Sequence, residues 1–122
     1  MPSINTSPQI DISVALNISN DTFLYFNALG QQFNGGATVT TPNTLINYRL
    51  IPNNNTLGFK LPVITAEVTS DITVSISPCK QIVTLIDSDL TNEDICVRLM
   101  VEEFSSGEVF ESADPKIKND PR

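Results

Sequence analysis

The 122-residue chain contains no histidine and no tryptophan, and only two of its residues are tyrosines. Without histidine, Ser-His-Asp and Cys-His catalysis and all histidine-ligated metal sites are excluded. Paired carboxylates that cleave sugars remain conceivable, but they usually work beside aromatic platforms, which are scarce here. No constellation of catalytic groups remains to be tested, so we predict a protein that is not an enzyme and carries no cofactor.

Long apolar runs are also missing, and none approaches the roughly 20 residues that a membrane helix needs. The polar start MPSINTSPQ lacks the regions of a signal peptide, so we expect a cytoplasmic protein. Basic residues are few: seven Lys and Arg stand against 14 Asp and Glu, a net charge of −7. Such a surface repels phosphate groups, which predicts that the chain binds neither nucleic acid nor membrane.

Cysteine is rare as well, with Cys79 and Cys96 as the two examples. Their spacing matches no zinc motif. In a cytoplasmic chain we expect two buried, reduced thiols. A Cys79–Cys96 bridge is the alternative if the two segments pair.

What the chain does have is apolar residues that alternate with polar ones. This period of two is typical of half-buried strands, and Gly, Pro and Asn clusters separate the runs at intervals of 8–12 residues. No segment carries a convincing helical pattern. We expect the core to include the centres of the clearest runs: Ile12, Val14, Leu16, Ile72, Val74, Val97 and Leu99.

These runs predict an all-β fold in a single domain over residues 1–122, with tails at 1–8 and 114–122. The stretch TLIDSDLTNEDICVRLMV resembles the E–F corner of immunoglobulin-like domains, in which a strand, an acidic turn and a Cys-bearing strand follow one another. We therefore predict an immunoglobulin-like antiparallel β-sandwich of about eight or nine strands.

The stretch DSDLTNED places four carboxylates on one turn: Asp87, Asp89, Glu93 and Asp94. Calcium prefers such a density of oxygen ligands. The turn departs from the EF-hand loop because Asn92 occupies the position where that loop requires Gly. We expect a solvated turn here, with Asp and Asn bonding their own backbone, and a calcium site is the alternative.

The chain closes on FESADPKIKNDP, which holds two Asp-Pro pairs, Asp114-Pro115 and Asp120-Pro121. Proline forces an extended conformation on the residue before it, so each pair sets a bend. Between the bends Ile117 is the only large apolar residue, and we expect it to pack residues 114–119 over an end or edge of the sandwich. A frayed terminus is the alternative. This ending resembles the DP-EP family, which is named for Asp-Pro and Glu-Pro motifs. The resemblance implies a bacterial β-sandwich of unknown function.

For function, we predict a structural or interaction module that forms a homo-oligomer through an edge strand, since edges invite pairing. The strands expected in ATVTT and TLINYRLI carry few charges that would prevent pairing. The alternative is a domain that binds a small ligand or calcium through the acidic loop 87–94.

Overall fold

The computed structural model describes residues 8–51, 56–65, 72–88, 93–113 and 115–119. These residues form strands and no helix, so an all-β fold is confirmed. The strands are β1 (Gln9–Asn17), β2 (Thr22–Phe26), β3 (Gln32–Phe33), β4 (Ala37–Val39), β5 (Thr44–Ile51), β6 (Leu57–Thr65), β7 (Ile72–Ile76), β8 (Ile82–Asp87), β9 (Glu93–Glu103), β10 (Val109–Glu111) and β11 (Lys116–Asn119). Among the described residues there is no helix that could span a membrane.

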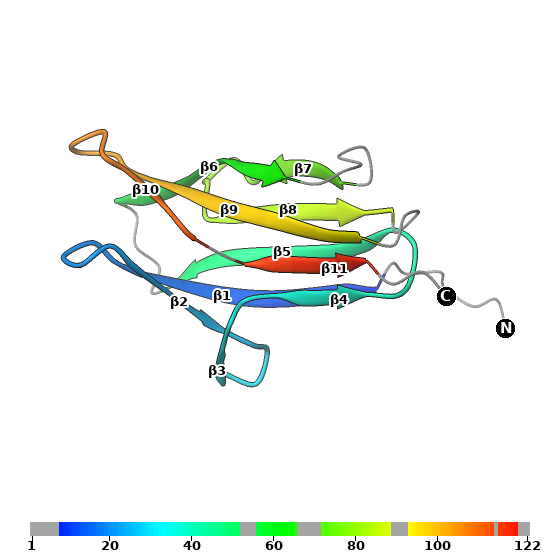
Figure 1. Ribbon diagram of the computed structural model, residues 1–122. Helices are drawn as coiled ribbons and strands as arrows, with labels where there is room; N and C mark the ends of the chain where they lie inside the picture. The colour runs from blue at the N-terminus through cyan, green and yellow to red at the C-terminus, as the bar shows by residue number, and fades with distance from the viewer. Residues whose placement is uncertain (1–7, 52–55, 66–71, 89–92, 114, 120–122) are drawn as a thin grey trace, which may run out of the picture.

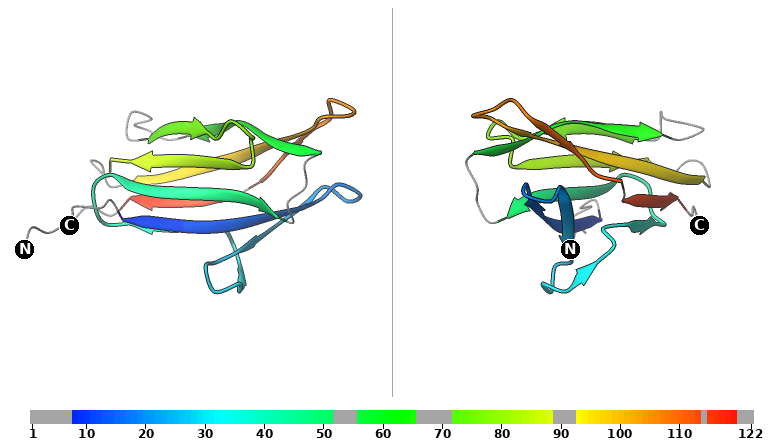
Figure 2. Two further views of the ribbon diagram at one scale, coloured as in Figure 1. Left: turned by 180° about the vertical axis from the view of Figure 1, so that it is seen from behind. Right: turned by 60° about the vertical axis from the view of Figure 1, so that its left-hand side comes forward.

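The strands build two sheets that lie face to face (Figures 1 and 2). The first sheet has six strands in the order β3-β2-β1-β5-β8-β7. In the second sheet β9 is central. On one edge it pairs with β6 from Cys96 to Glu103, on its other edge it pairs with β10 and then β11, and β4 lies beyond β11. The apolar face of each sheet points toward the other sheet, which makes the molecule a β-sandwich.

The core consists of the alternating residues that face the space between the sheets. In β9, for example, Ile95, Val97 and Leu99 are fully buried while Arg98 is exposed. Of the residues predicted for the core, five are buried: Ile12, Val14, Ile72, Val97 and Leu99. The other two, Leu16 and Val74, are partly buried and pack against the core. The period of two therefore identified the inner faces correctly.

The sheets are mixed rather than purely antiparallel, and the 11 strands outnumber the eight or nine predicted. Most pairs are antiparallel, but β1 pairs with β5 and β11 pairs with β4 in parallel. Parallel neighbours need a long connection. Here the chain leaves the first sheet after β3, forms β4 in the second sheet and returns as β5 beside β1 (Figure 1).

The crossing between the sheets depends on Gly35. Its φ is +82°, in the left-handed region that glycine adopts without strain. A Cβ at this position would lie 2.6 Å from the ring of Tyr25. The buried hydroxyl of Tyr48 donates a hydrogen bond to the Gly35 carbonyl at 2.9 Å, and burial raises the pKa of Tyr48. Gly35 thus lets the chain pass closely over two core tyrosines.

The C-terminal segment contributes a strand to the interior of the second sheet. Beyond β10, Ser112 continues the pairing: its amide donates to the Leu99 carbonyl, and its hydroxyl accepts from the Leu99 amide. The Pro115 carbonyl then accepts from the Val97 amide, and β11 follows between β9 and β4. This segment was expected to pack over an end or edge of the sandwich. It instead forms a strand inside the second sheet, with a partner strand on each side.

Candidate functional site

The edge strand β6 carries a β-bulge at its centre. Two residues of β6, Leu61 and Pro62, lie opposite a single residue of β9, Leu99. Proline has no N–H to donate to a ladder, and a bulge on an edge strand is one of the few places in a sheet that accepts it. The bulge leaves the Leu61 side chain 69% exposed at the surface.

The turn between β7 and β8 closes one half of the outer edge of β6. The Phe59 amide donates to the Lys80 carbonyl at 2.7 Å. The side-chain amide of Gln81 donates to the Leu57 carbonyl at 2.6 Å. Because these bonds occupy backbone groups of β6 that point away from β9, this half of the edge is closed to another strand.

Lys80 lies where this turn meets β6, and its position is closely defined. Its φ of +62° is left-handed, a conformation that costs an L-residue with a side chain about 1–2 kcal/mol. Gly58 permits the approach, because a Cβ at position 58 would lie 2.9 Å from the Lys80 Cβ and would also collide with the Phe104 ring. The Lys80 Nζ lies 5.8 Å from the centroid of that ring, within cation–π range.

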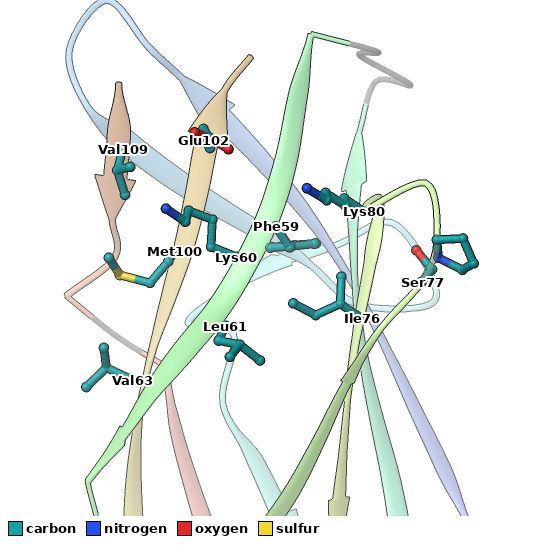
Figure 3. A pocket seen from close by; sticks show the side chains of 11 residues that line it. Phe59, Lys60, Leu61, Val63, Ile76, Ser77, Lys80, Met100, Glu102 and Val109 are labelled. Atoms are coloured by element: carbon teal, nitrogen blue, oxygen red, sulfur yellow. The ribbon is translucent and has the colours of Figure 1, made fainter. Parts of the chain in front are cut away.

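A groove runs along β6 beside these residues and has a volume of about 640 Å³. We call it the β6 groove. Its polar groups include Lys60, Lys80 and Glu102, and Figure 3 shows Lys60 and Glu102 on one side of β6 and Lys80 on the other. Within the described part of the chain, neither lysine has a carboxylate at ion-pair distance. Most of the lining is apolar: Phe59, Leu61, Val63, Ile76, Met100 and Val109.

The acidic loop does not place its carboxylates together as far as the structure describes it. Asp87 is the last residue of β8 and is fully buried, whereas Asp94 is exposed on β9 in the other sheet. Asp89 and the Glu93 side chain lie outside the described residues. Among the residues that are described, no three His, Cys, Asp or Glu side chains gather as metal ligands would. The solvated turn and the calcium site both stay predictions.

The two cysteines are free, and neither is fully buried. The prediction of buried thiols was wrong for Cys79, because it lies at the tip of the β7–β8 turn and is exposed. Cys96 is half-buried because its side chain alternates with the inward-facing residues of β9. A hydrogen bond between the Ser77 hydroxyl and the Cys79 sulfur, 3.4 Å long, lowers the pKa of the Cys79 thiol.

Sequence reasoning missed the β6 groove. The one local signal was Pro62, which interrupts the run LGFKLPVIT and marks an edge strand or a bulge. The remaining walls come from β7, the β7–β8 turn, β9 and β10, and only the fold brings these segments to β6.

Comparison with known families identifies the family of this chain. Residues 8–121 match the DP-EP family. The chain belongs to the DP-EP family. No curated protein matches it. The match spans every described strand, so the family extends over the whole sandwich rather than over the closing motif alone.

In this DP-EP chain the first Asp-Pro pair falls between β10 and β11, where the strand beside β9 is interrupted. Pro115 is buried, and Ile117 is fully buried inside the second sheet. Asp114, Asp120 and Pro121 lie outside the described residues. From Glu111 to Lys116 the chain advances five residues while β9 advances four, from Met100 to Cys96. The segment that contains Pro115 thus has one residue more than the part of β9 that it passes. The chain then continues beside β9 as β11, so the proline does not end the pairing.

Proposed function

We propose that this DP-EP chain is a non-catalytic interaction module that self-associates by pairing β7 of one copy with β7 of another. The observation that carries the proposal is the character of β7, the outermost strand of the six-stranded sheet. Its sequence ITVSI has no charge and no proline, and its register with β8 is unbroken from Ile72 to Ile76. Within the described residues β7 pairs only with β8.

The other strands are less suited to pairing with a second copy. The expectation for TLINYRLI was wrong, because it forms β5 in the interior of the first sheet between β1 and β8. ATVTT does lie at an edge, but its strand β4 has only three residues and β3 has two. β6 carries Lys60, Pro62 and a bulge, all of which oppose strand pairing.

A two-fold axis at β7 would join two six-stranded sheets into one continuous sheet. Backbone hydrogen bonds would supply the affinity. The half-buried Val74 and Ile76 would become less exposed against apolar residues of β7 in the partner copy. Because each chain carries a net charge of −7, repulsion opposes the contact, and added salt should strengthen it.

Sedimentation velocity over a concentration series tests the proposal. We expect the native chain to dimerise, more tightly at high salt, and Thr73→Lys to remain monomeric. Thr73 is an exposed residue of β7, so the fold should tolerate lysine there. The matched control is Thr38→Lys on β4, another exposed threonine on an edge strand, which should dimerise like the native chain. A native chain that is monomeric at every concentration, or equal dissociation by both variants, would contradict the proposal.

The alternative of calcium binding through the acidic loop 87–94 has its own test. For a solvated turn, millimolar calcium leaves the melting temperature unchanged. A site filled at 100 times its dissociation constant would instead add about 2.7 kcal/mol of stability. An upward shift that Asp87→Asn or Asp89→Asn removes would support the calcium site. The immunoglobulin-like arrangement, the bacterial source and the cytoplasmic location stay predictions.

A further inference from the structure

We propose that the β6 groove binds one molecule of an amphiphilic anion of the long-chain carboxylate class. The apolar chain would lie along the bulge of β6, and the carboxylate would meet the ammonium group of Lys80. This site is separate from the acidic loop, and it does not require self-association of the chain.

Four of the eight large apolar residues that are exposed in the described part of the chain lie at or beside the groove. Leu61 is 69% exposed, and Val63 and Val109 are 46% and 40% exposed. All three line the groove, and Phe104, 45% exposed, lies beside it against Lys80. Figure 3 shows Leu61 on the Lys80 side of β6, and Val63 and Val109 on the opposite side. Apolar surface gathered along both sides of one strand in this way marks a binding site more often than single exposed residues do. The volume of about 640 Å³ lies within the range of about 300–1,000 Å³ that is typical of small-ligand sites.

The charge at the groove points to an anionic head group. Lys80 occupies a left-handed turn position that glycine or asparagine would fill with less strain. What lysine adds at this position is an ammonium group on the wall of an apolar groove. The Phe104 ring limits where that group lies, and among the described residues no acidic side chain pairs with it. Glu102, the acid that lines the groove, lies on the other side of β6 (Figure 3).

The occupant is a single molecule rather than a lipid surface. An anionic bilayer would face the whole chain with its net charge of −7, and that repulsion disfavours docking. One bound molecule interacts mainly with the charges of the groove, because those farther away than about 8–10 Å are screened by salt.

Isothermal titration calorimetry with laurate below its micelle concentration tests the proposal, with dodecyltrimethylammonium as a probe of equal chain length and opposite charge. We expect one laurate per chain and at least tenfold weaker binding of the cation. The net charge of the protein alone would produce the reverse preference, so a cation that binds as well as laurate would overturn the proposal. Phosphatidylglycerol vesicles should not bind, and binding to vesicles without binding of free laurate would also overturn it.

Two pairs of variants locate the site. Lys80→Asn keeps a residue that tolerates the left-handed backbone and should weaken laurate binding about tenfold. Its control Lys118→Asn removes an exposed lysine on β11, outside the groove, and should bind as the native chain does. Leu61→Ser should weaken binding about threefold to tenfold, whereas Leu29→Ser, at an 82% exposed leucine elsewhere, should not. Equal losses within either pair, with all variants folded by their melts, would overturn the proposal.

Discussion

Strands β6 and β7 lie next to each other on one side of the sandwich, one in each sheet, and their free edges differ (Figure 1). Along β6, Lys60, Pro62 and the bulge oppose pairing, and the β7–β8 turn bonds to part of the edge. Along β7 there is no charge, no proline and no bulge. Sheet edges are usually protected against pairing, and this difference is the basis of the proposed association through β7.

The protection of β6 also shapes the surface beside it. The bulge exposes Leu61, and the turn brings Lys80 against Gly58 and Phe104. The features that prevent strand pairing thus create an apolar groove with a cation on its wall. The proposed ligand site and the protection of this edge therefore depend on the same residues.

The largest loss of stability is expected when an interior strand, rather than an edge strand, is removed. Deleting residues 113–122 removes β11 and exposes one edge of β9, so we expect the loss of most of the folding free energy, about 5–15 kcal/mol for a typical domain. Circular dichroism and denaturant melts measure this loss. Deleting only residues 121–122 should change nothing, and a folded, equally stable long truncation would show that β11 is dispensable.

One leucine lies in the bulge and another lies opposite it on β9, and their side chains differ in burial. Leu99 is fully buried opposite the bulge, and Leu61 is 69% exposed within it. Leu99→Ala should destabilise the fold by about 2–5 kcal/mol, whereas Leu61→Ala should change stability by no more than about 0.5 kcal/mol. Urea melts of both variants measure the difference. A loss below about 1 kcal/mol for Leu99→Ala would mean that the inner face of β9 is wrongly assigned.

The contact between β6 and the β7–β8 turn depends on a residue without a side chain. In Gly58→Ala the new methyl group would collide with the Lys80 Cβ and the Phe104 ring. The ring can swing away, but the Lys80 Cβ is part of the turn, so we expect a loss of about 1–3 kcal/mol. Melts measure it. Gly107→Ala measures the opposite case, in which a Cβ meets nothing within 4 Å but φ is +74°, so a loss there comes from backbone strain and not from a collision. An unchanged melt for Gly58→Ala would show that the turn moves freely.

Removing the charge and the proline of β6 should make the half of its edge that the turn leaves open more like β7. In a Thr73→Lys background, which blocks β7, the further changes Lys60→Thr and Pro62→Val remove a charge and a proline from β6. We expect stability to change by no more than about 1 kcal/mol, while association reappears through β6. Sedimentation velocity detects it. A chain that stays monomeric would show that the bulge and the turn alone protect this edge.

The smallest expected effect concerns the thiol at the tip of the turn. The Ser77 hydroxyl lowers the pKa of Cys79 by hydrogen bonding, so the thiolate should persist to lower pH than in an ordinary cysteine, whose pKa is about 8.5. The rate of alkylation by iodoacetamide against pH measures this pKa, and Ser77→Ala should raise it. Intact mass without reductant should show two free thiols, and a mass two units lower would reveal a bridge.

The sequence by itself determined most of the segments that become strands and which of their faces are buried, although it placed residues 114–122 in a tail. The alternation in β1 and β9 assigned Ile12, Val14, Val97 and Leu99 to the core, and all four are buried there. Pro62 indicated that its strand is broken. These properties are local, because a period of two depends only on neighbouring residues along one strand.

Only the tertiary structure decided which strands lie beside each other. β5 became an interior strand and β7 an edge because of pairings between residues far apart in the chain, and alternation carries no information on such neighbours. The β6 groove is assembled from four separate segments for the same reason. Ile117 shows the division clearly: its apolar side chain indicated burial, but β9 and β4 made its segment a strand by supplying partners on both sides.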